Sequence, residues 1–280
     1  MTRDLSLKEC ITRVGARTRI MGILNVTPDS FSDGGECVDV ATAVKRAVEM
    51  QAIGADIIDI GGESSRPGSK SVSDQEEIKR VMPVIMALKE IVKIPISIDT
   101  CKSGVAREAL KEGVSIVNDI TALKGDSRMA RVISEYGAAV VLMHMSGTPE
   151  VMQEEPFYAD VIEEIYSCLS VSIEVALTAG IRAEKIIVDP GIGFGKTLKH
   201  NLTILRELRR FKRLGKPILV GVSRKSFIGE LTGKGVNDRV FGTVAGCAAA
   251  IMNGADIIRV HDVARMRDVA CVIDAITKGD

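Results

Sequence analysis

A short unit, in which a helical pattern stops at a glycine and an apolar run follows, recurs along this 280-residue chain. The segment GADIIDI at 54–60 returns as GADIIRV at 254–260, and looser copies are GVSIVND at 113–119 and GAAVVLM at 137–143. Glycine is the residue that most readily adopts the left-handed cap of a helix. Short, β-branched, almost wholly apolar runs are typical of parallel strands buried on both faces. The unit therefore predicts a parallel α/β fold.

The number of these units predicts the architecture. Apolar runs predict strands at 20–24, 56–60, 95–98, 115–117, 138–143, 185–188, 217–222 and 256–260. Helical patterns lie at 40–53, 74–92, 104–111, 127–136, 159–178, 201–214, 239–252 and 263–276. Eight strands that alternate with eight helices predict a single-domain (β/α)₈ TIM barrel over residues 1–280, with a core at roughly 20–277 and an N-terminal extension at 1–19. A doubly wound open sheet could use the same units, but the count of eight weighs against it.

The stretch VDPGIGFGKT at 188–197 ends in the GKT of a phosphate-binding loop. That loop needs G-x-x-x-x-G-K-[ST], but Pro190 stands five residues before Gly195. The dinucleotide-binding fingerprint also fails, because the glycines are spaced G-x-G-x-G. Both nucleotide motifs are excluded, and an acid followed by a flexible glycine turn remains.

Composition narrows the class of partner. Net charge is zero and the pI is about 6.8, which argues against a nucleic-acid partner. The polar N-terminus and the lack of an apolar run of ~20 residues argue against a signal peptide and a membrane span. The cysteines are scattered without a CxxC pair, and no His/Cys/Asp/Glu cluster has the spacing of a metal cage. We expect a cytoplasmic protein with mostly buried thiols at Cys10, Cys37, Cys101, Cys168, Cys247 and Cys271.

Polar residues follow every predicted strand. In (β/α)₈ barrels the chemistry lies at the carboxyl ends of the strands, so these residues should share one rim. Burying them without partners would cost several kcal/mol each, which predicts a ligand rich in hydrogen-bonding groups and negative charge. In chain order they are Asn25, Asp59, Asp99, Asn118 with Asp119, His144, Asp189, Ser223-Arg224-Lys225, and Arg259 with His261.

Some of these residues also have structural explanations. Asp59, before two glycines, is explained equally well as a turn residue. Arg259 and His261 are separated by one residue, so both should face the mouth of the barrel. A structural Arg–Asp pair would explain Arg259 but not the histidine beside it, which favours binding. His144 fits a buried structural role or a functional one, and His200 is interpreted as a capping or solvated residue.

Three loops at the same rim are far longer than the ~2–6 residues usual in barrels. We call them the first rim loop (25–39, NVTPDSFSDGGECVD), the second rim loop (61–73, GGESSRPGSKSVS) and the third rim loop (144–158, HMSGTPEVMQEEPFY). Long loops rich in Gly, Ser, Asp and Pro at a catalytic rim are typical of lids or substrate-ordering segments.

The segment GILNVTPDSFSDGG at 22–35 closely resembles the dihydropteroate synthase family. Further matches are DIGGESSRPG (59–68), SIDT (97–100), VNDI (117–120), DPGIGFGK (189–196), SRKSFIG (223–229) and RVHDV (259–263). The resemblance runs from about residue 20 to residue 263 and implies a (β/α)₈ barrel, in agreement with the count of units. Ser65 departs from the threonine more usual in the family but keeps the hydroxyl, and Cys101 lies at a variable position.

The resemblance implies a transferase of folate biosynthesis. Such enzymes join p-aminobenzoate to 6-hydroxymethyl-7,8-dihydropterin pyrophosphate and release pyrophosphate and 7,8-dihydropteroate. It also implies Mg²⁺ as cofactor, a dissociative (SN1-like) substitution, a homodimer through the last helices, and inhibition by sulfonamides, which mimic p-aminobenzoate.

The resemblance also implies roles for individual residues. Asp189 would accept the pair of N–H donors on the pterin edge. Arg259 would bind the pyrophosphate, because a forked guanidinium matches the geometry of phosphate oxygens. Asn25 would be the single protein ligand of Mg²⁺, an ion that typically has few protein ligands. The pterin set is Asp99, Asn118, Met143, Asp189, Phe194 and Lys225; the pyrophosphate set is Asn25, Arg259 and His261; the p-aminobenzoate set is Phe31, Ser65, Arg66, Pro67 and Ser226; the catalytic set is Asp33, Arg66 and Lys225.

Two other classes of protein remain as alternatives. A methyltetrahydrofolate-dependent methyltransferase could share a carboxylate-lined ring site, but it needs no anion pocket. A barrel that binds a pterin or a partner protein without catalysis is the other. Intact rim loops and the combination of Asn25, Asp189, Lys225 and Arg259 argue against it.

Overall fold

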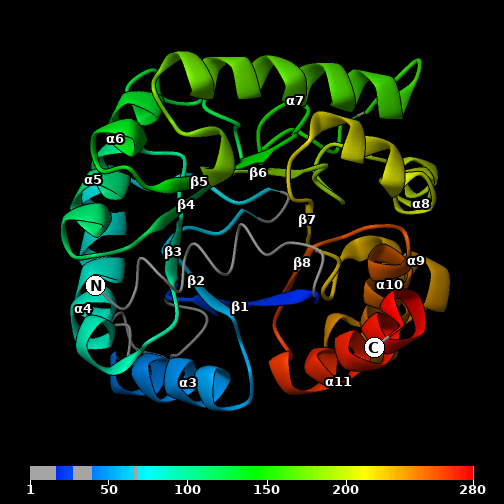
Figure 1. The fold of residues 1–280 in the computed structure, drawn as a ribbon, viewed down its shortest axis with the longest axis horizontal. Helices are drawn as coiled ribbons and strands as arrows, with labels where there is room; N and C mark the ends of the chain where they lie inside the picture. Colours follow the sequence, from blue (N-terminus) through cyan, green and yellow to red (C-terminus); the bar gives the residue numbers. More distant parts are fainter. Residues whose placement is uncertain (1–16, 28–39, 66–67, 155, 280) are drawn as a thin grey trace.

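The computed structural model describes residues 17–27, 40–65, 68–154 and 156–279 (Figure 1). Within these residues an eight-stranded sheet has the order β6-β5-β4-β3-β2-β1-β8-β7, and the strands pair in parallel. An isolated parallel bridge between Val188 and Ile218 brings β6 beside β7 and completes the ring. The predicted (β/α)₈ barrel is confirmed. Its strands are β1 (Arg19–Asn25), β2 (Ile57–Gly61), β3 (Ile96–Asp99), β4 (Ile116–Asp119), β5 (Ala139–Met143), β6 (Ile186–Asp189), β7 (Leu219–Val220) and β8 (Ile257–Val260).

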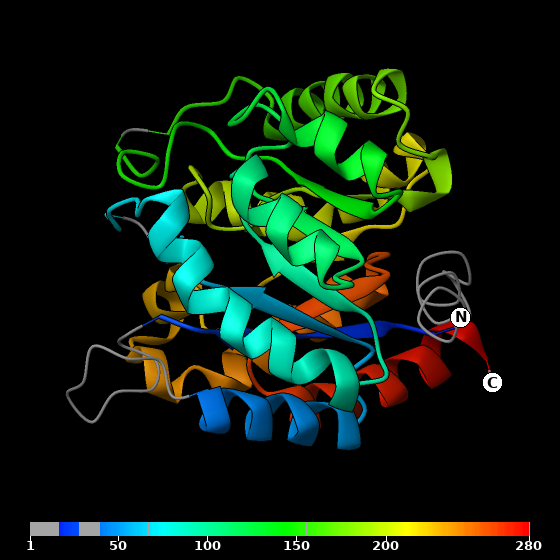
Figure 2. The same ribbon diagram turned by 90° about the vertical axis from the view of Figure 1, so that its left-hand side faces the viewer.

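Helices form the outer layer, and α3 and α4 lie side by side on the outside of the barrel (Figure 2). The α-helices are α3 (Val40–Ala52), α4 (Asp74–Ile91), α5 (Ser103–Lys111), α6 (Met129–Glu135), α7 (Val161–Thr178), α8 (Leu198–Arg206), α9 (Ser226–Thr232), α10 (Val240–Met252) and α11 (Val263–Lys278). Short 3₁₀ helices are η1 (Ala183–Lys185), η2 (Leu208–Leu214) and η3 (Val236–Asp238). Within the described residues, no helix is long and apolar enough to cross a membrane.

The helix predicted at 201–214 is divided into α8 and η2. Leu208, Phe211 and Leu214 are spaced by three, and the first two are fully buried. Side chains three residues apart lie on one face of a 3₁₀ helix as well as of an α-helix, so the apolar pattern cannot distinguish them. None of the eight predicted helices corresponds to α9, a helix of seven residues that begins shortly after β7.

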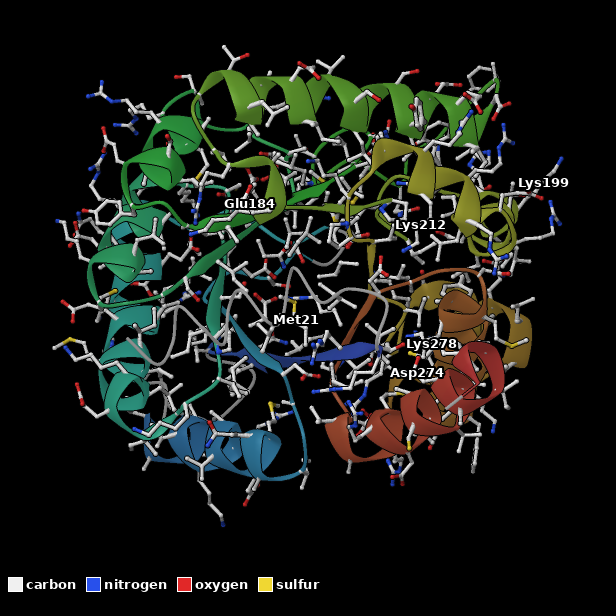
Figure 3. All side chains as sticks on the ribbon, viewed as in Figure 1. Met21, Glu184, Lys199, Lys212, Asp274 and Lys278 are labelled. Atoms are coloured by element: carbon white, nitrogen blue, oxygen red, sulfur yellow. The ribbon has the colours of Figure 1, made fainter. Side chains whose placement is uncertain are left out.

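The repeated Gly-Ala-Asp unit has the same structural function in its two closest copies. An oxygen of Asp56 accepts a hydrogen bond from the backbone N–H of Ile20 at 2.9 Å, and an oxygen of Asp256 accepts one from Ile218 N–H at 2.7 Å. Each acid therefore satisfies a backbone N–H near the start of a neighbouring strand, at the amino end of the barrel. At the same end, Thr18 donates from its N–H to Asp274 of α11 at 2.6 Å, and Asp274 also pairs with Lys278 (Figure 3).

The barrel interior is filled by a separate apolar cluster, which includes Met21 on β1 (Figure 3). Even-numbered strands each contribute an isoleucine to it: Ile57, Ile116, Ile187 and Ile257. Side chains two residues apart on a strand share a face, so the next layer toward the carboxyl ends is made by the residues two positions later. These are Asp59, Asn118, Asp189 and Arg259. An apolar floor thus lies directly beneath a polar and charged layer.

The prediction of mostly buried thiols is wrong for the described cysteines. Cys247 is buried, Cys101 and Cys168 are half-buried, and Cys271 is exposed. Burial of a residue in a helix follows the face on which it lies rather than the residue type, and Cys271 lies on the exposed face of α11. Cys10 and Cys37 lie outside the described residues.

Candidate active site

A charged network spans the mouth of the barrel. Nε of Arg259 on β8 donates to Oδ2 of Asp59 on β2 at 2.6 Å, and its Nη2 donates to Oδ2 of Asp99 on β3 at 2.5 Å. The same oxygen of Asp59 accepts from Nδ2 of Asn118 on β4 at 3.1 Å. Burial raises the pKa of Asp99 to about 7, and the Arg259 guanidinium opposes that shift. Asp59 is therefore a buried partner of Arg259 and not a turn residue.

The glycine turn after β6 places an acid beside a lysine. Asp189 accepts a hydrogen bond from Gly191 N–H at 2.7 Å. Gly191 has a φ of +70°, and a Cβ atom there would lie 1.9 Å from the carbonyl oxygen of His144, so only glycine fits. Burial raises the pKa of Asp189, whereas the neighbouring Lys225 ammonium lowers it.

Lys225 follows β7 and extends across this turn. Its Nζ donates to the carbonyl of Ile192 and lies 4.0 Å from the centre of the Phe194 ring. Burial lowers the pKa of Lys225 to about 7, against the attraction of Asp189. Arg224, just before it, has a left-handed φ of 59°, and its N–H donates to Thr243 Oγ1 at 3.1 Å. This contact holds the bend that directs Lys225 inward.

A second set of basic residues surrounds His261. The hydroxyl of Ser223 lies 2.9 Å from His261 Nδ1. The pKa of His261 is lowered to about 3, mainly by burial and further by the positive charges of Arg224, Arg259 and Arg46. His261 is therefore neutral at neutral pH and can offer a hydrogen bond, while the arginines supply the positive charge. Arg46 lies on α3 and was not predicted as a site residue, because no sequence motif includes it.

The second rim loop is anchored at its base by an ion-pair cluster. Nζ of Lys102 donates to Glu63 at the start of the loop and, at 2.7 Å, to Oε2 of Glu77 on α4. Burial raises the pKa of Glu77, and Lys102 opposes that shift. The loop also meets the third rim loop, since Gly68 N–H donates to the Pro149 carbonyl at 3.0 Å. Lys102 therefore connects the loop to the helices behind it.

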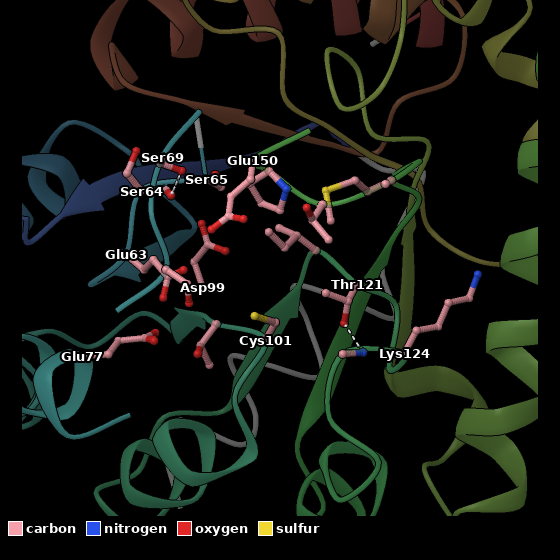
Figure 4. Close-up of a pocket in the computed structure, with 18 residues that line it drawn as sticks. Glu63, Ser64, Ser65, Ser69, Glu77, Asp99, Cys101, Thr121, Lys124 and Glu150 are labelled. Carbon is pink, nitrogen blue, oxygen red and sulfur yellow. Dashed lines mark hydrogen bonds between the residues drawn. The ribbon is translucent and has the colours of Figure 1, made fainter. Parts of the chain in front are cut away.

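A cavity of about 440 Å³ opens beneath these two loops (Figure 4). Asp99, which pairs with Arg259, lies in its wall, and Ser65 and Glu150 approach it from the second and third rim loops. The cavity is thus continuous with the charged network at the barrel mouth. Its lining also includes Glu63, Glu77, Cys101, Thr121 and Lys124.

Comparison with known proteins identifies the family. A family model described as pterin binding enzyme matches residues 21–261. The dihydropteroate synthase of Synechocystis sp. is 49% identical over 263 residues, which cover 94% of this chain and 91% of that protein. The chain belongs to the dihydropteroate synthase family.

Solved structures agree with this assignment. A dihydropteroate synthase from Clostridium difficile, in the presence of pteroic acid, superposes with a TM-score of 0.89 at 49% identity, covering 94% of this chain and 98% of that chain. One from Xanthomonas albilineans, with 4-aminobenzoic acid, superposes with a TM-score of 0.87 at 43% identity, covering 93% of both chains. As a dihydropteroate synthase family member at this similarity, the chain is a transferase, and the methyltransferase and non-catalytic alternatives are set aside.

The residues assigned through the dihydropteroate synthase resemblance fall into two groups. Phe31, Asp33, Arg66 and Pro67 lie outside the described residues. The others lie at the carboxyl rim: Asp99 and Asn118 belong to the charged network, Met143 pairs in register with Asp189, Phe194 underlies Lys225, Ser65 lines the cavity, Ser226 begins α9, and Asn25 ends β1.

Other rim residues of this dihydropteroate synthase family member are structural. Nζ of Lys196 donates to the Phe194 carbonyl at 2.8 Å and lies 3.1 Å from His144 Nδ1. These contacts hold the glycine turn against β5, so His144 has the structural role. The capping interpretation of His200 is confirmed, because its Nδ1 accepts a hydrogen bond from Thr197 N–H at 3.3 Å in a capping box.

Proposed function

We propose that this chain condenses p-aminobenzoate with 6-hydroxymethyl-7,8-dihydropterin pyrophosphate through residues of this rim. The observation that supports this best is the convergence of Asp189, Lys225 and Arg259. Asp189 ends β6, Lys225 follows β7 and Arg259 lies on β8, and β7 lies beside both other strands. The charges of Asp189 and Arg259 both act on the pKa of Lys225. One small molecule with a flat donor-rich edge and an anionic tail can therefore contact all three.

The pterin ring would bind over the apolar floor. The Asp189 carboxylate is buried and accepts one hydrogen bond within the described residues, from Gly191, so it can also accept the paired N–H donors of the pterin. Lys225 would donate to the acceptor atoms of the ring. Asp99 and Asn118 would complete the edge, and Met143 and Phe194 would pack against the faces.

The diphosphate would bind on the β8 side. Arg259 provides a forked guanidinium, and His261 provides a neutral imidazole beside it. Arg46 and Arg224, which act on the same imidazole, would add positive charge. Stabilising the leaving pyrophosphate in this way lowers the barrier through electrostatics and positioning.

The residues at the end of β1 fit a role for Mg²⁺. Oδ1 of Asn25 and Oδ2 of Asp99 each lie 3.7 Å from the position that a Cβ atom would take on Gly61. The glycine thus leaves open a space faced by two oxygen atoms, the ligand type that Mg²⁺ prefers. We propose Asn25 as the protein ligand, with substrate phosphates as the others. When bound, Mg²⁺ would neutralise charge on the leaving diphosphate.

The substitution itself needs no enzyme nucleophile. Departure of pyrophosphate leaves a cation on the exocyclic methylene, which the electron-rich pterin stabilises and the amine of p-aminobenzoate attacks. We propose Asp33 as the carboxylate near that cation. Ser65, Arg66 and Ser226 would hold the p-aminobenzoate, whose ring would pack against Phe31 and Pro67; sulfonamides should compete there.

We also propose a homodimer through α10 and α11. These adjacent helices carry Phe241, Val272 and Ile276 with exposed fractions of 76%, 59% and 67%. Large exposed apolar side chains on neighbouring helices are typical of a protein interface. A second copy of the chain is the occupant implied by the family.

The proposed reaction is tested with purified protein, the pterin diphosphate, p-aminobenzoate and Mg²⁺, by following pyrophosphate release and dihydropteroate formation together. We expect equal amounts of both products, and no dihydropteroate without p-aminobenzoate. Pyrophosphate release that does not depend on p-aminobenzoate would show a hydrolase and reject the proposal. Asp256→Asn, at the opposite end of the barrel, is the control variant.

A further inference from the structure

Asp59 makes no proposed contact with either substrate, yet it is fully buried at the centre of the site. Its Oδ2 accepts two hydrogen bonds, from Arg259 at 2.6 Å and from Asn118 at 3.1 Å. Strand β2 lies between β4 and β8, with one strand separating it from each. A single carboxylate oxygen therefore joins a residue assigned to the pterin to a residue assigned to the diphosphate.

The contact with Asp59 determines which way the Asn118 side chain faces. An ionised carboxylate only accepts hydrogen bonds, so the carboxamide must turn its Nδ2 toward Asp59. The opposite orientation would place two acceptor oxygens against each other in a buried site, which is costly. Oδ1 of Asn118 is thereby directed away from Asp59, where it can accept an N–H from a ligand.

The same contact restrains Arg259. Its two ion pairs use Nε and Nη2, with Asp59 and Asp99 as partners. Within the described residues these are the hydrogen bonds of the guanidinium, so the N–H groups of Nη1 remain for an anion. Oδ1 of Asp59 is buried without a hydrogen-bond partner in the same residues, so the two donors at Oδ2 are what hold the carboxylate in place.

We propose that Asp59 is a positioning residue that orients Asn118 as an acceptor for the pterin and anchors Arg259 for the diphosphate. One buried carboxylate would thus fix the positions of the pterin site and the diphosphate site relative to each other. The inference rests on the proposed function, because it takes the pterin and diphosphate sites from it.

The test measures the two halves separately. Binding of 6-hydroxymethylpterin, which lacks the diphosphate, and of inorganic pyrophosphate with Mg²⁺ is followed by calorimetry for the wild type and Asp59→Asn. We expect both affinities to fall roughly tenfold or more, since a hydrogen bond to a charged group is lost. The KM for p-aminobenzoate at saturating pterin diphosphate should stay within about twofold, because Asp59 bonds to Arg259 and Asn118 and not to Ser65 or Ser226.

Asp256→Asn provides the matched control. It makes the same change to a buried carboxylate that holds a backbone N–H and Lys212 at the amino end of the barrel. It should lower thermal stability and leave both affinities unchanged. Equal losses of affinity in the two variants would mean that Asp59 has only a structural role, which overturns the proposal.

A double-mutant cycle with Asn118→Ala tests whether Asp59 acts through Asn118. Asp59→Asn should cost roughly tenfold in pterin affinity in the wild type but less than about twofold in the Asn118→Ala background. Additive losses would overturn the proposal. The cycle is repeated with Asp59→Ser, so that it does not depend on one variant folding. Failure of the wild type to bind the pterin would instead reject the proposed function.

Discussion

Arg259 and Asp99 are ion-paired across the barrel mouth, with 2.5 Å between Nη2 and Oδ2, although 160 residues separate them in the chain. One belongs to the proposed diphosphate site and the other to the proposed pterin site. The two sites therefore share one network of charges. Changing a charge in either site should therefore affect ligand binding at the other.

Asp189→Ala should abolish binding of the pterin diphosphate while the fold stays intact. The methyl group cannot accept the paired N–H donors, and the loss should be on the order of 100-fold or more for two charge-assisted hydrogen bonds. Calorimetry measures the affinity, and circular dichroism checks the fold. Undiminished affinity would remove Asp189 from the site.

The catalytic efficiency kcat/KM for the pterin diphosphate should fall as pH rises above about 7. Burial lowers the pKa of Lys225 to about 7, so the free enzyme loses this ammonium in that range. Lys225→Arg, which stays protonated, should lack this limb of the profile. The same shift affects stability: between about pH 7 and 10.5 the unfolded chain binds more protons at this lysine, so its contribution to the free energy of unfolding rises with pH. An unchanged limb in Lys225→Arg would contradict the assignment.

Lys102→Met should raise the KM for p-aminobenzoate several-fold and leave pterin diphosphate binding nearly unchanged. Without this ammonium, Glu63 at the base of the second rim loop and the buried Glu77 repel each other. The free energy of unfolding should also fall, by about 3 kcal/mol for a broken buried pair. Lys102→Arg keeps the charge and should restore most of the KM. Steady-state kinetics measure the KM for each substrate. Equal increases in the KM for both substrates would show that the Lys102 ion-pair cluster does not act through the second rim loop.

Removing Mg²⁺ with EDTA should suppress turnover, and excess Mg²⁺ should restore it. Asn25→Ala should raise the Mg²⁺ concentration needed for half-maximal activity by roughly tenfold, since it removes one of few protein ligands. A titration of activity against free Mg²⁺ measures this. Full activity in EDTA would exclude the metal from the mechanism.

The double variant Phe241→Glu with Ile276→Glu should convert a dimer into a monomer. Both side chains are largely exposed on α10 and α11, so the charges would be tolerated in the monomer and repel across an interface. Light scattering after size exclusion gives the mass of each form. A wild-type chain that runs as a monomer would reject the dimer, and Val171→Glu on the exposed side of α7 is the control.

The site was only partly accessible from the sequence. Gly191 and Asp189 belong to a contiguous motif, so their turn and acid could be assigned together. The interpretation of Asp59 as a possible turn residue was wrong because its partner, Arg259, stands 200 residues away. Arg46 and Lys102 belong to no sequence motif. Only the packing of α3 and of the start of α5 brings these two residues close to the rim residues.

By itself, the sequence determined the barrel and the rim. The repeated glycine, apolar run and polar ending are local patterns, and local sterics and burial translate them directly into helix caps, parallel strands and a shared edge. Only the tertiary structure decided which rim residues are partners. The curved sheet brings side chains at the carboxyl ends of β2, β4 and β8 within hydrogen-bonding distance, although one strand separates β2 from each of the others. The pairing of Asp59 with Arg259 and Asn118 depends on that arrangement rather than on spacing along the chain.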